Sequence, residues 1–188
     1  MNLYLLRSTG LFVCWLLSYA TTLAADEDLL GIVAQNLGSP TNSRLAPYFD
    51  VPVVEDPSKA TEQKLKKVSA FGLTFSGRAK LDGGKFSAVS YWTDDPLLRP
   101  AVAEAAFAAI AAKLQQQHGS ARVADVPNFE DASTSVTRVL RWHVAEEVLL
   151  LSIHRRSSNA SVTLERKKRH AWLADMGPDE SEFWQATL

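Results

Sequence analysis

The chain has 188 residues, of which 46% are hydrophobic and 22% are charged, so it is long enough and apolar enough for one globular domain with its own core. Twenty Lys and Arg side chains stand against 21 Asp and Glu side chains. This balance argues against a protein that is held to nucleic acid by its overall charge.

Residues 1–24 are predicted to form a secretory signal peptide. One positive side chain, Arg7, precedes a continuous apolar run over residues 11–17, and the segment ends in small residues. The apolar run is shorter than the roughly 20 residues that a membrane-spanning helix needs, which makes an uncleaved anchor the weaker alternative. The only cysteine, Cys14, lies in this segment, so the mature chain is expected to lack disulfides, thiolate metal ligands and a cysteine nucleophile. We expect a periplasmic or secreted protein with no transmembrane anchor after cleavage.

Residues 25–38 are expected to contain a short helix, because apolar residues recur at helical spacing after an acidic start and Gly38 follows as a stop. The apolar positions are Leu29, Leu30, Val33 and Leu37. Residues 39–66 contain four prolines and show neither a helical nor a strand period, so they are predicted to form an extended linker or an arm that packs on the domain. An arm would pack through Leu45, Tyr48, Phe49 and Val53.

A β-hairpin is predicted from Ser69 to Trp92, where apolar and polar residues alternate around a two-residue Gly83-Gly84 turn. The expected register pairs Asp82 with Lys85, Leu81 with Phe86, Ala79 with Ala88, and Phe75 with Trp92. This register places the large apolar residues of both strands on one face, except Val89 and Tyr91.

A long helix is predicted over residues 100–118. Pro96 or Pro100 suits the first turn, alanine dominates the body, and Gly119 supplies the stop. An alanine-rich apolar stripe suits close packing on a sheet, and it consists of Val102, Ala103, Ala106, Phe107, Ile110 and Leu114. A polar loop is expected to follow, over residues 120–134.

Three further strands are predicted, at residues 135–144, 148–155 and 161–166. The middle strand is nearly all apolar, which is typical of a central strand covered on both faces. The fold class is therefore α+β: an antiparallel sheet of about five strands in the order ββαβββ, with one main helix on a face and short terminal helices. The sheet and helix are expected to form one domain over residues 67–173, followed by a tail at 174–188.

The sequence between Arg141 and His170 contains three histidines, which come from different strands and lack the spacing of a metal motif. No metal ligand is predicted at His143, His154 or His170. The chain also lacks the local motifs of serine hydrolases, P-loops and dinucleotide-binding folds, so no catalytic and no cofactor-binding residue is predicted. Residues that meet only in the folded chain leave an enzyme with a dispersed site as an alternative.

The run of residues 165–170, with Arg155 and Arg156 expected nearby across a hairpin, forms a local positive patch. On a strand its side chains alternate between faces, with Arg166 and Lys168 on one side and Lys167 and Arg169 on the other. We interpret these cations as protection of an edge strand against sheet-to-sheet aggregation. Contact with an acidic partner or with anionic lipid headgroups is the second interpretation, and nucleic acid is not expected as a partner.

The sequence favours an exported, non-catalytic protein that binds another protein or an envelope component, such as an inhibitor, immunity or accessory factor. Two alternatives stay open: a carrier of a small apolar ligand held between the main helix and the sheet, and an envelope hydrolase. Aromatic and cationic side chains contribute strongly to binding surfaces. The residues expected to contact a partner or ligand are Tyr91, Trp92, Trp142, Arg155, Arg156, Lys167, Arg169 and Trp184.

Overall fold

The computed structural model describes residues 29–31, 33, 49–50, 61–82, 85–127, 136–169 and 172. The predicted signal peptide, most of the predicted linker and the tail from residue 174 lie outside these residues. Within them, no helix combines the length and the apolar character needed to cross a membrane. Residues 29–31 and 33 are helical, and the rest of the helix expected before residue 38 is outside the described part.

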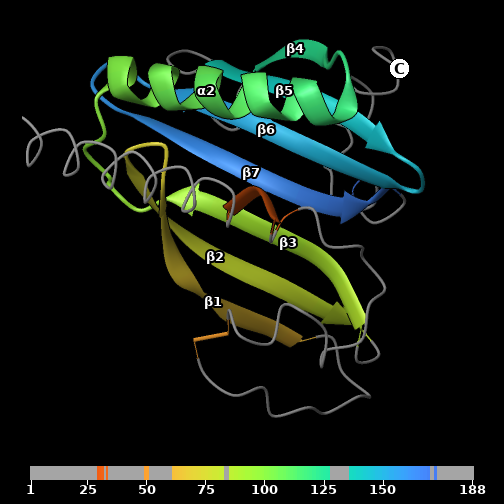
Figure 1. The fold of residues 1–188 in the computed structure, drawn as a ribbon. Coiled ribbons are helices and arrows are strands. Elements are labelled where there is room, and N and C mark those ends of the chain that lie inside the picture. The colour runs from red at the N-terminus through yellow and green to blue at the C-terminus, as the bar shows by residue number, and fades with distance from the viewer. Residues whose placement is uncertain are drawn as a thin grey trace, which may run out of the picture.

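The chain forms an antiparallel sheet of seven strands with one main helix, in the order βββαββββ (Figure 1). Across the sheet the strands lie in the order β1-β2-β3-β7-β6-β5-β4, so β7 occupies the centre and joins the two halves. The strands are β1 (Thr61–Ala70), β2 (Leu73–Asp82), β3 (Lys85–Thr93), β4 (Arg122–Pro127), β5 (Val136–Val144), β6 (Glu147–Arg155) and β7 (Ala160–Lys168).

The α+β class is confirmed, and the predicted number of five strands is wrong. The first six residues of β1 lie in the segment expected to be a linker, and β4 lies in the expected polar loop. Both are edge strands. β1 is mostly charged or polar, because an edge strand has water on one side and needs less apolar surface, and β4 is only six residues long. A β-bulge between Leu65 and Val68 also interrupts the alternation of β1.

The main helix α2 (Pro100–His118) begins and ends as the sequence predicts. Gly119 ends it with a φ of 80°, which glycine adopts without strain, and its N–H donates to the Gln115 carbonyl at 2.9 Å. The buried side of α2 faces β5, β6 and β7 (Figure 1). It consists of Ala103, Ala106, Ile110, Ala111 and Leu114.

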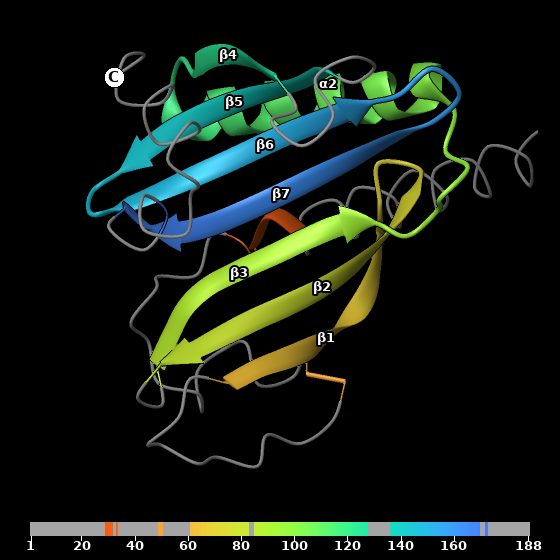
Figure 2. The ribbon, with the colours of Figure 1, turned by 180° about the vertical axis from the view of Figure 1, so that it is seen from behind.

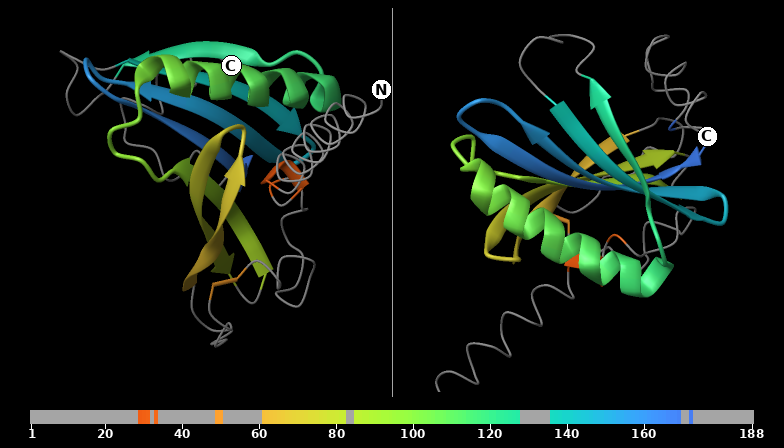
Figure 3. Two further views of the ribbon diagram at one scale, coloured as in Figure 1. Left: turned by 60° about the vertical axis from the view of Figure 1, so that its left-hand side comes forward. Right: turned by 90° about the horizontal axis from the view of Figure 1, so that it is seen from above.

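The two halves of the sheet differ in how they are covered. α2 lies over β5, β6 and β7 on one side, and seen from behind, β1, β2, β3 and β7 have no described element across them (Figures 1 and 2). Strong twist turns β1, β2 and β3 steeply away from the strands beneath α2 (Figure 3). At the centre, β3 and β7 pair over only five residues, from Ala88–Lys167 to Trp92–Thr163.

The main core lies on the α2 side and extends past the helix to β1 and β2. Phe49 of the N-terminal region stacks on Phe86 at 5.9 Å between ring centroids, and its backbone forms a bridge to Leu65. The helical residues Leu29, Leu30 and Val33 are also buried in this core. A smaller apolar cluster lies on the opposite face of the α2-bearing half and contains Ala124, Val139, Val148, Leu150 and Trp172.

The β2–β3 hairpin is present, but its predicted register holds only near the turn. Asp82 pairs with Lys85 and Leu81 with Phe86, as expected. Ser87 is then an extra residue, so Lys80 pairs with Ala88 and Ser76, rather than Phe75, pairs with Trp92. The predicted pairing of Phe75 with Trp92 is therefore wrong, and Phe75 pairs with Thr93 instead.

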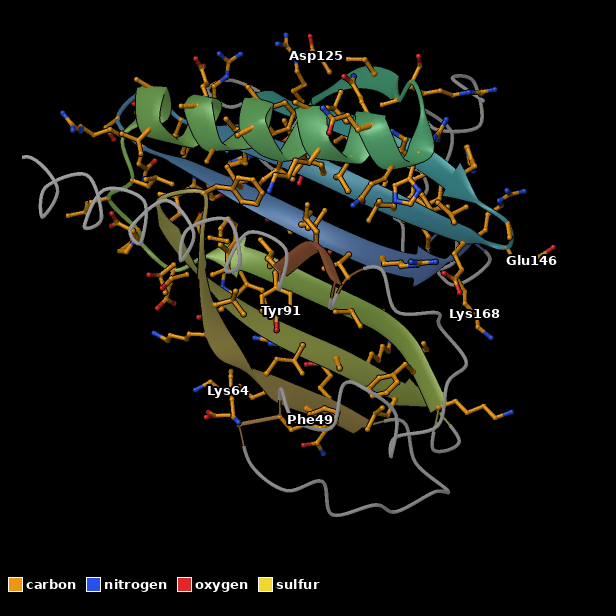
Figure 4. The ribbon with its side chains drawn as sticks, viewed as in Figure 1. Phe49, Lys64, Tyr91, Asp125, Glu146 and Lys168 are labelled. Carbon is orange, nitrogen blue, oxygen red and sulfur yellow. The ribbon has the colours of Figure 1, made fainter. Side chains whose placement is uncertain are left out.

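The bulge reverses the predicted facing of the aromatic residues in β3. Tyr91 is fully buried, and Figure 4 shows its side chain on the side of the sheet that carries α2. Val89 is buried in the same core. Trp92 points to the other face and is half-buried. Gly77 pairs with Tyr91, and a Cβ atom at Gly77 would lie 2.4 Å from the Tyr91 ring. The ring thus occupies space that only glycine leaves on β2.

Candidate binding surface

The side of β1, β2, β3 and β7 that faces away from α2 carries polar side chains at alternate positions, and we call it the open face. Successive strands contribute their outward residues in rows across the sheet. One row contains Glu62, Lys80, Ala88 and Lys167. The next row contains Lys64, Arg78, Ser90 and Glu165. Trp92 and Ser76 lie in the row after that.

Two hollows occupy the open face, with volumes of about 360 and 370 Å³. Both are lined by Glu62, Arg78 and Trp92, so these three residues separate one hollow from the other. The guanidinium of Arg78 lies 5.2 Å from the centre of the Trp92 ring, within the range of a cation–π contact. Arg78 also donates to Glu62 Oε2 at 3.0 Å. The stacked pair forms a fixed aromatic and cationic centre on this face.

The first hollow lies over β3, with Ala88 and Ser90 between charged residues of β2 and β7. Ser90 Oγ donates to Glu165 Oε1 at 2.9 Å, and Lys167 Nζ lies 3.2 Å from Glu165 Oε2. These contacts orient the β7 side of the hollow. Among the described residues, no carboxylate forms an ion pair with Lys80 on the β2 side.

The second hollow lies over β1 and β2 and ends at Asp94. Lys67 Nζ and Ser76 Oγ both donate to the Asp94 carboxylate, the latter at 2.9 Å. The hydrogen bond from Lys67, followed by that from Ser76, lowers the pKa of Asp94 below its ordinary value of 3.8. Asp94 is therefore ionised at neutral pH. Over both hollows, five cations stand against three carboxylates, so the open face has mixed charge with a positive excess.

The structure disperses the residues predicted to contact a partner. Trp92 and Lys167 lie on the open face, whereas Tyr91 is in the core on the other side of the sheet. Trp142 is buried and donates from Nε1 to the Gly119 carbonyl at 2.9 Å, at the end of α2. These three aromatic residues therefore do not line one pocket. Trp184 is outside the described residues.

The predicted cationic patch is divided between the two ends of the β6–β7 pair. Arg155 pairs with Ala160 beside the turn, and Lys168 pairs with Glu147 at the far end, so the two groups of cations are not neighbours. Arg155 donates to Glu104 of α2 at 2.8 Å and Arg156 is exposed in the turn. Arg169 donates to the Ala145 carbonyl at 3.2 Å.

β7 is the central strand, so the interpretation of its cations as protection of a sheet edge is wrong. Arg166 is buried and donates from Nε to Glu147 Oε2 at 2.5 Å, and from Nη1 to the Val33 carbonyl at 3.4 Å. The edge strand β1 instead has a β-bulge that contains Lys66 and Lys67, and lysines and bulges at an edge both oppose sheet-to-sheet aggregation.

His143 and His154 lie apart. His143 pairs with Val148 at one end of β5 and β6, and His154 pairs with Thr137 at the other. His154 Nδ1 and Thr137 Oγ1 share a hydrogen bond of 2.7 Å. Within the described ranges, no three His, Cys, Asp or Glu side chains converge as metal ligands would. His170 is outside these ranges.

The sequence-based prediction named Trp92 and Lys167 but missed Glu62, Arg78, Lys80 and Glu165. Glu62 lies in a run of polar residues at the start of β1 that has no strand period. Arg78, Lys80 and Glu165 belong to alternating patterns in β2 and β7, where every second side chain is charged or polar. That alternation was the signal that could have found them, because it marks a strand with one solvated face.

Comparisons with known protein families, with curated proteins and with solved structures find no match. A proposal for the function therefore rests on the geometry of the open face.

Proposed function

We propose that the protein is an exported, non-catalytic binding protein that contacts another protein or an envelope component through the open face. Export rests on the signal peptide predicted at residues 1–24. Binding is supported above all by one observation: Trp92 and Arg78 stack at the centre of a polar face that no described element covers (Figure 2). Tryptophan and arginine are, with tyrosine, enriched among the residues that dominate binding energy.

The layout of charge supports a partner of defined shape. The side chains around Trp92 are already oriented by hydrogen bonds and ion pairs, including Arg78 to Glu62 and Ser90 to Glu165. Side chains that are ordered before binding lose less conformational entropy when a partner arrives. Alternating charges across a face discriminate between partners, because a wrong partner brings like charges together.

Site-specific photocrosslinking in the native host tests this proposal. A photoreactive amino acid at Lys64 or Ser90, both on the open face, is expected to give a discrete crosslinked product. The matched control positions are Ala108 and Gln116, which are exposed on α2 on the other side of the sheet. Equal products from both faces, or products from α2 alone, would contradict the assignment of the open face as the binding surface.

A further inference from the structure

The hollow over β3 has the form of a short trough along that strand, which we call the β3 trough. Its floor is made of the small residues Ala88 and Ser90, and Trp92 closes one end. The wall on β2 consists of Arg78 and Lys80, and the wall on β7 consists of Glu165 and Lys167. Figure 2 shows the course of β3 between these two strands. Its volume of about 360 Å³ suits one or two side chains of a partner rather than a whole element.

Two lysines oppose each other across the floor of the trough. Lys80 pairs with Ala88, and Ala88 pairs with Lys167, so the methyl group of Ala88 lies between them in the same row. Strands in a sheet are about 4.8 Å apart, which puts the two lysine Cα atoms roughly 10 Å apart. Lysine side chains are long and flexible, so both ammonium groups are able to reach one anionic group placed over Ala88.

The positive charge of Lys80 is not balanced by an ion pair within the trough. Glu165 forms an ion pair with Lys167 and Glu62 forms one with Arg78, and no carboxylate of the described residues forms one with Lys80. The lining as a whole has three cations against two carboxylates. One negative charge from a partner would complete the set of pairs.

The two carboxylates that line the trough favour one class of partner over others. Glu62 and Glu165 would repel the neighbouring phosphates of a polyanion or of an anionic lipid surface. A polypeptide instead places a single acidic side chain beside neutral or basic ones, and so complements a face of mixed charge. The Trp92 ring beside the trough offers an apolar contact to the residues that flank such an acid.

We propose that the β3 trough receives an Asp or Glu side chain of a partner polypeptide, held between Lys80 and Lys167 with its flanking residues against Trp92. This inference rests on the proposed function, since it names the chemistry of the partner at the same face.

The test places the photoreactive amino acid at Ala88, on the floor of the trough, in the full chain expressed in its host. The crosslinked product is digested, and the attached fragment is identified by mass spectrometry. An attached peptide with an Asp or Glu next to the crosslinked position is the expected result. An attached lipid or polysaccharide, or a peptide without a neighbouring acidic residue, would overturn the inference.

Charge reversal then measures the contribution of the two lysines. In the protein with the photoreactive amino acid at Ala88, Lys80→Glu with Lys167→Glu is expected to lower the yield of crosslink about tenfold, as loss of a close charge pair does at other interfaces. Arg99→Glu with Arg122→Glu is the matched control, because both residues are exposed, neither lines a hollow of the open face, and the net charge changes equally. The control is expected to leave the yield unchanged.

A milder pair of changes protects the test from a folding defect. Lys80→Gln with Lys167→Gln removes both charges without placing new carboxylates beside Glu62 and Glu165, and is expected to lower the yield in the same direction. Unchanged yields in both lysine variants, with product still formed from Lys64 and Ser90, would refute the acidic contact and leave the proposed function standing. Absence of product from every open-face position would refute the proposed function itself, and the inference with it.

Discussion

β6 carries apolar side chains on both of its faces, whereas β2 alternates Phe75, Ala79 and Leu81 with Ser76, Arg78 and Lys80. The difference follows from position. β6 lies beneath α2 on one side and within the smaller apolar cluster on the other, while β2 has the core on one side and solvent on the other. The same antiparallel sheet thus serves as a two-sided scaffold in one half and as a one-sided platform in the other. Changes that separate stability from binding will test this division.

The largest effect is expected at Arg166, on the central strand that the two halves share. Arg166→Met leaves Glu147 buried without the guanidinium that it contacts at 2.5 Å, and should lower the free energy of unfolding by about 3 to 5 kcal/mol. Urea unfolding measures the loss. Arg166→Met with Glu147→Gln is the control expected to lose less, because it leaves no unpaired buried charge. Equal losses in the two variants would show that the charge of Glu147 is not the cause.

A slightly smaller loss of stability is expected in the half of the sheet beneath α2. Leu151 of β6 is fully buried against the α2 side, so Leu151→Ala should lower the free energy of unfolding by about 2 to 5 kcal/mol. Leu97→Ala provides the control, because Leu97 is 78% exposed and its truncation removes little buried surface. Thermal unfolding of both variants compares them, and similar melting temperatures would contradict the described core.

On the core side of β2 and β3, opposite the open face, Gly77 and Tyr91 pack closely. Gly77→Ala should cost about 1 to 3 kcal/mol, because the new methyl group meets the buried Tyr91 ring. Tyr91→Leu should cost less in the Gly77→Ala background than in the unchanged protein, since the smaller side chain makes room. A double-mutant cycle measured by urea unfolding gives the coupling between the two positions. Additive losses would mean that the two residues do not interact.

Trp92 should separate binding from stability. Trp92→Ala is expected to lower the free energy of unfolding by about 1 kcal/mol or less, because the ring is half-buried and its described partner is the cation of Arg78. The same change should weaken partner binding by about 2 kcal/mol or more if Trp92 is the anchor of the open face. Crosslink yield from Lys64 reports the binding, and melting temperature reports the stability. A large loss of stability with unchanged binding would reverse the roles that we assign to the two faces.

The smallest effect is a dependence of stability on pH in the α2-bearing half. Burial lowers the pKa of His118, His143 and His154 below the ordinary value of 6.5, with further lowering by nearby arginines. The unfolded chain therefore takes up protons first, so the contribution of these histidines to stability is fully present above pH 6.5 and is lost as the pH drops through that value toward the lower pKa of the folded state. Melting temperatures at pH 7.5 and 5.5 should differ less after replacement of all three by Gln. An unchanged difference would assign the effect to other groups.

Local patterns were sufficient for the elements whose environment is uniform. The alanine-rich stripe and Gly119 fixed the bounds of α2, and the apolar run of β6 indicated its coverage on both faces. β4 was missed because it is short and lies at an edge. The order of strands was beyond local analysis, since the return of β7 to the side of β3 depends on contacts between distant segments.

For the candidate site, the sequence pointed to Trp92 and Lys167 without bringing them together. Both residues line the first hollow because β3 pairs with β7, and no local pattern specifies such a long-range pairing. Arg78 and Lys80 could have been recognised from the alternation of β2, but the assumed unbroken hairpin placed Trp92 on the inner face, away from both. A single residue, Ser87, separates the two interpretations.

The extra residue Ser87 decides which side chains of β3 face outward. Its side chain donates to the Lys80 carbonyl at 3.1 Å, and every residue from Ala88 to Thr93 owes its facing to the presence of this one extra position. Deleting Ser87 would restore an unbroken hairpin register and move each later side chain of β3 to the opposite face, with Tyr91 directed to water and Trp92 to the interior. In a related chain, a gain or loss of one residue in this hairpin would therefore alter recognition more than many substitutions.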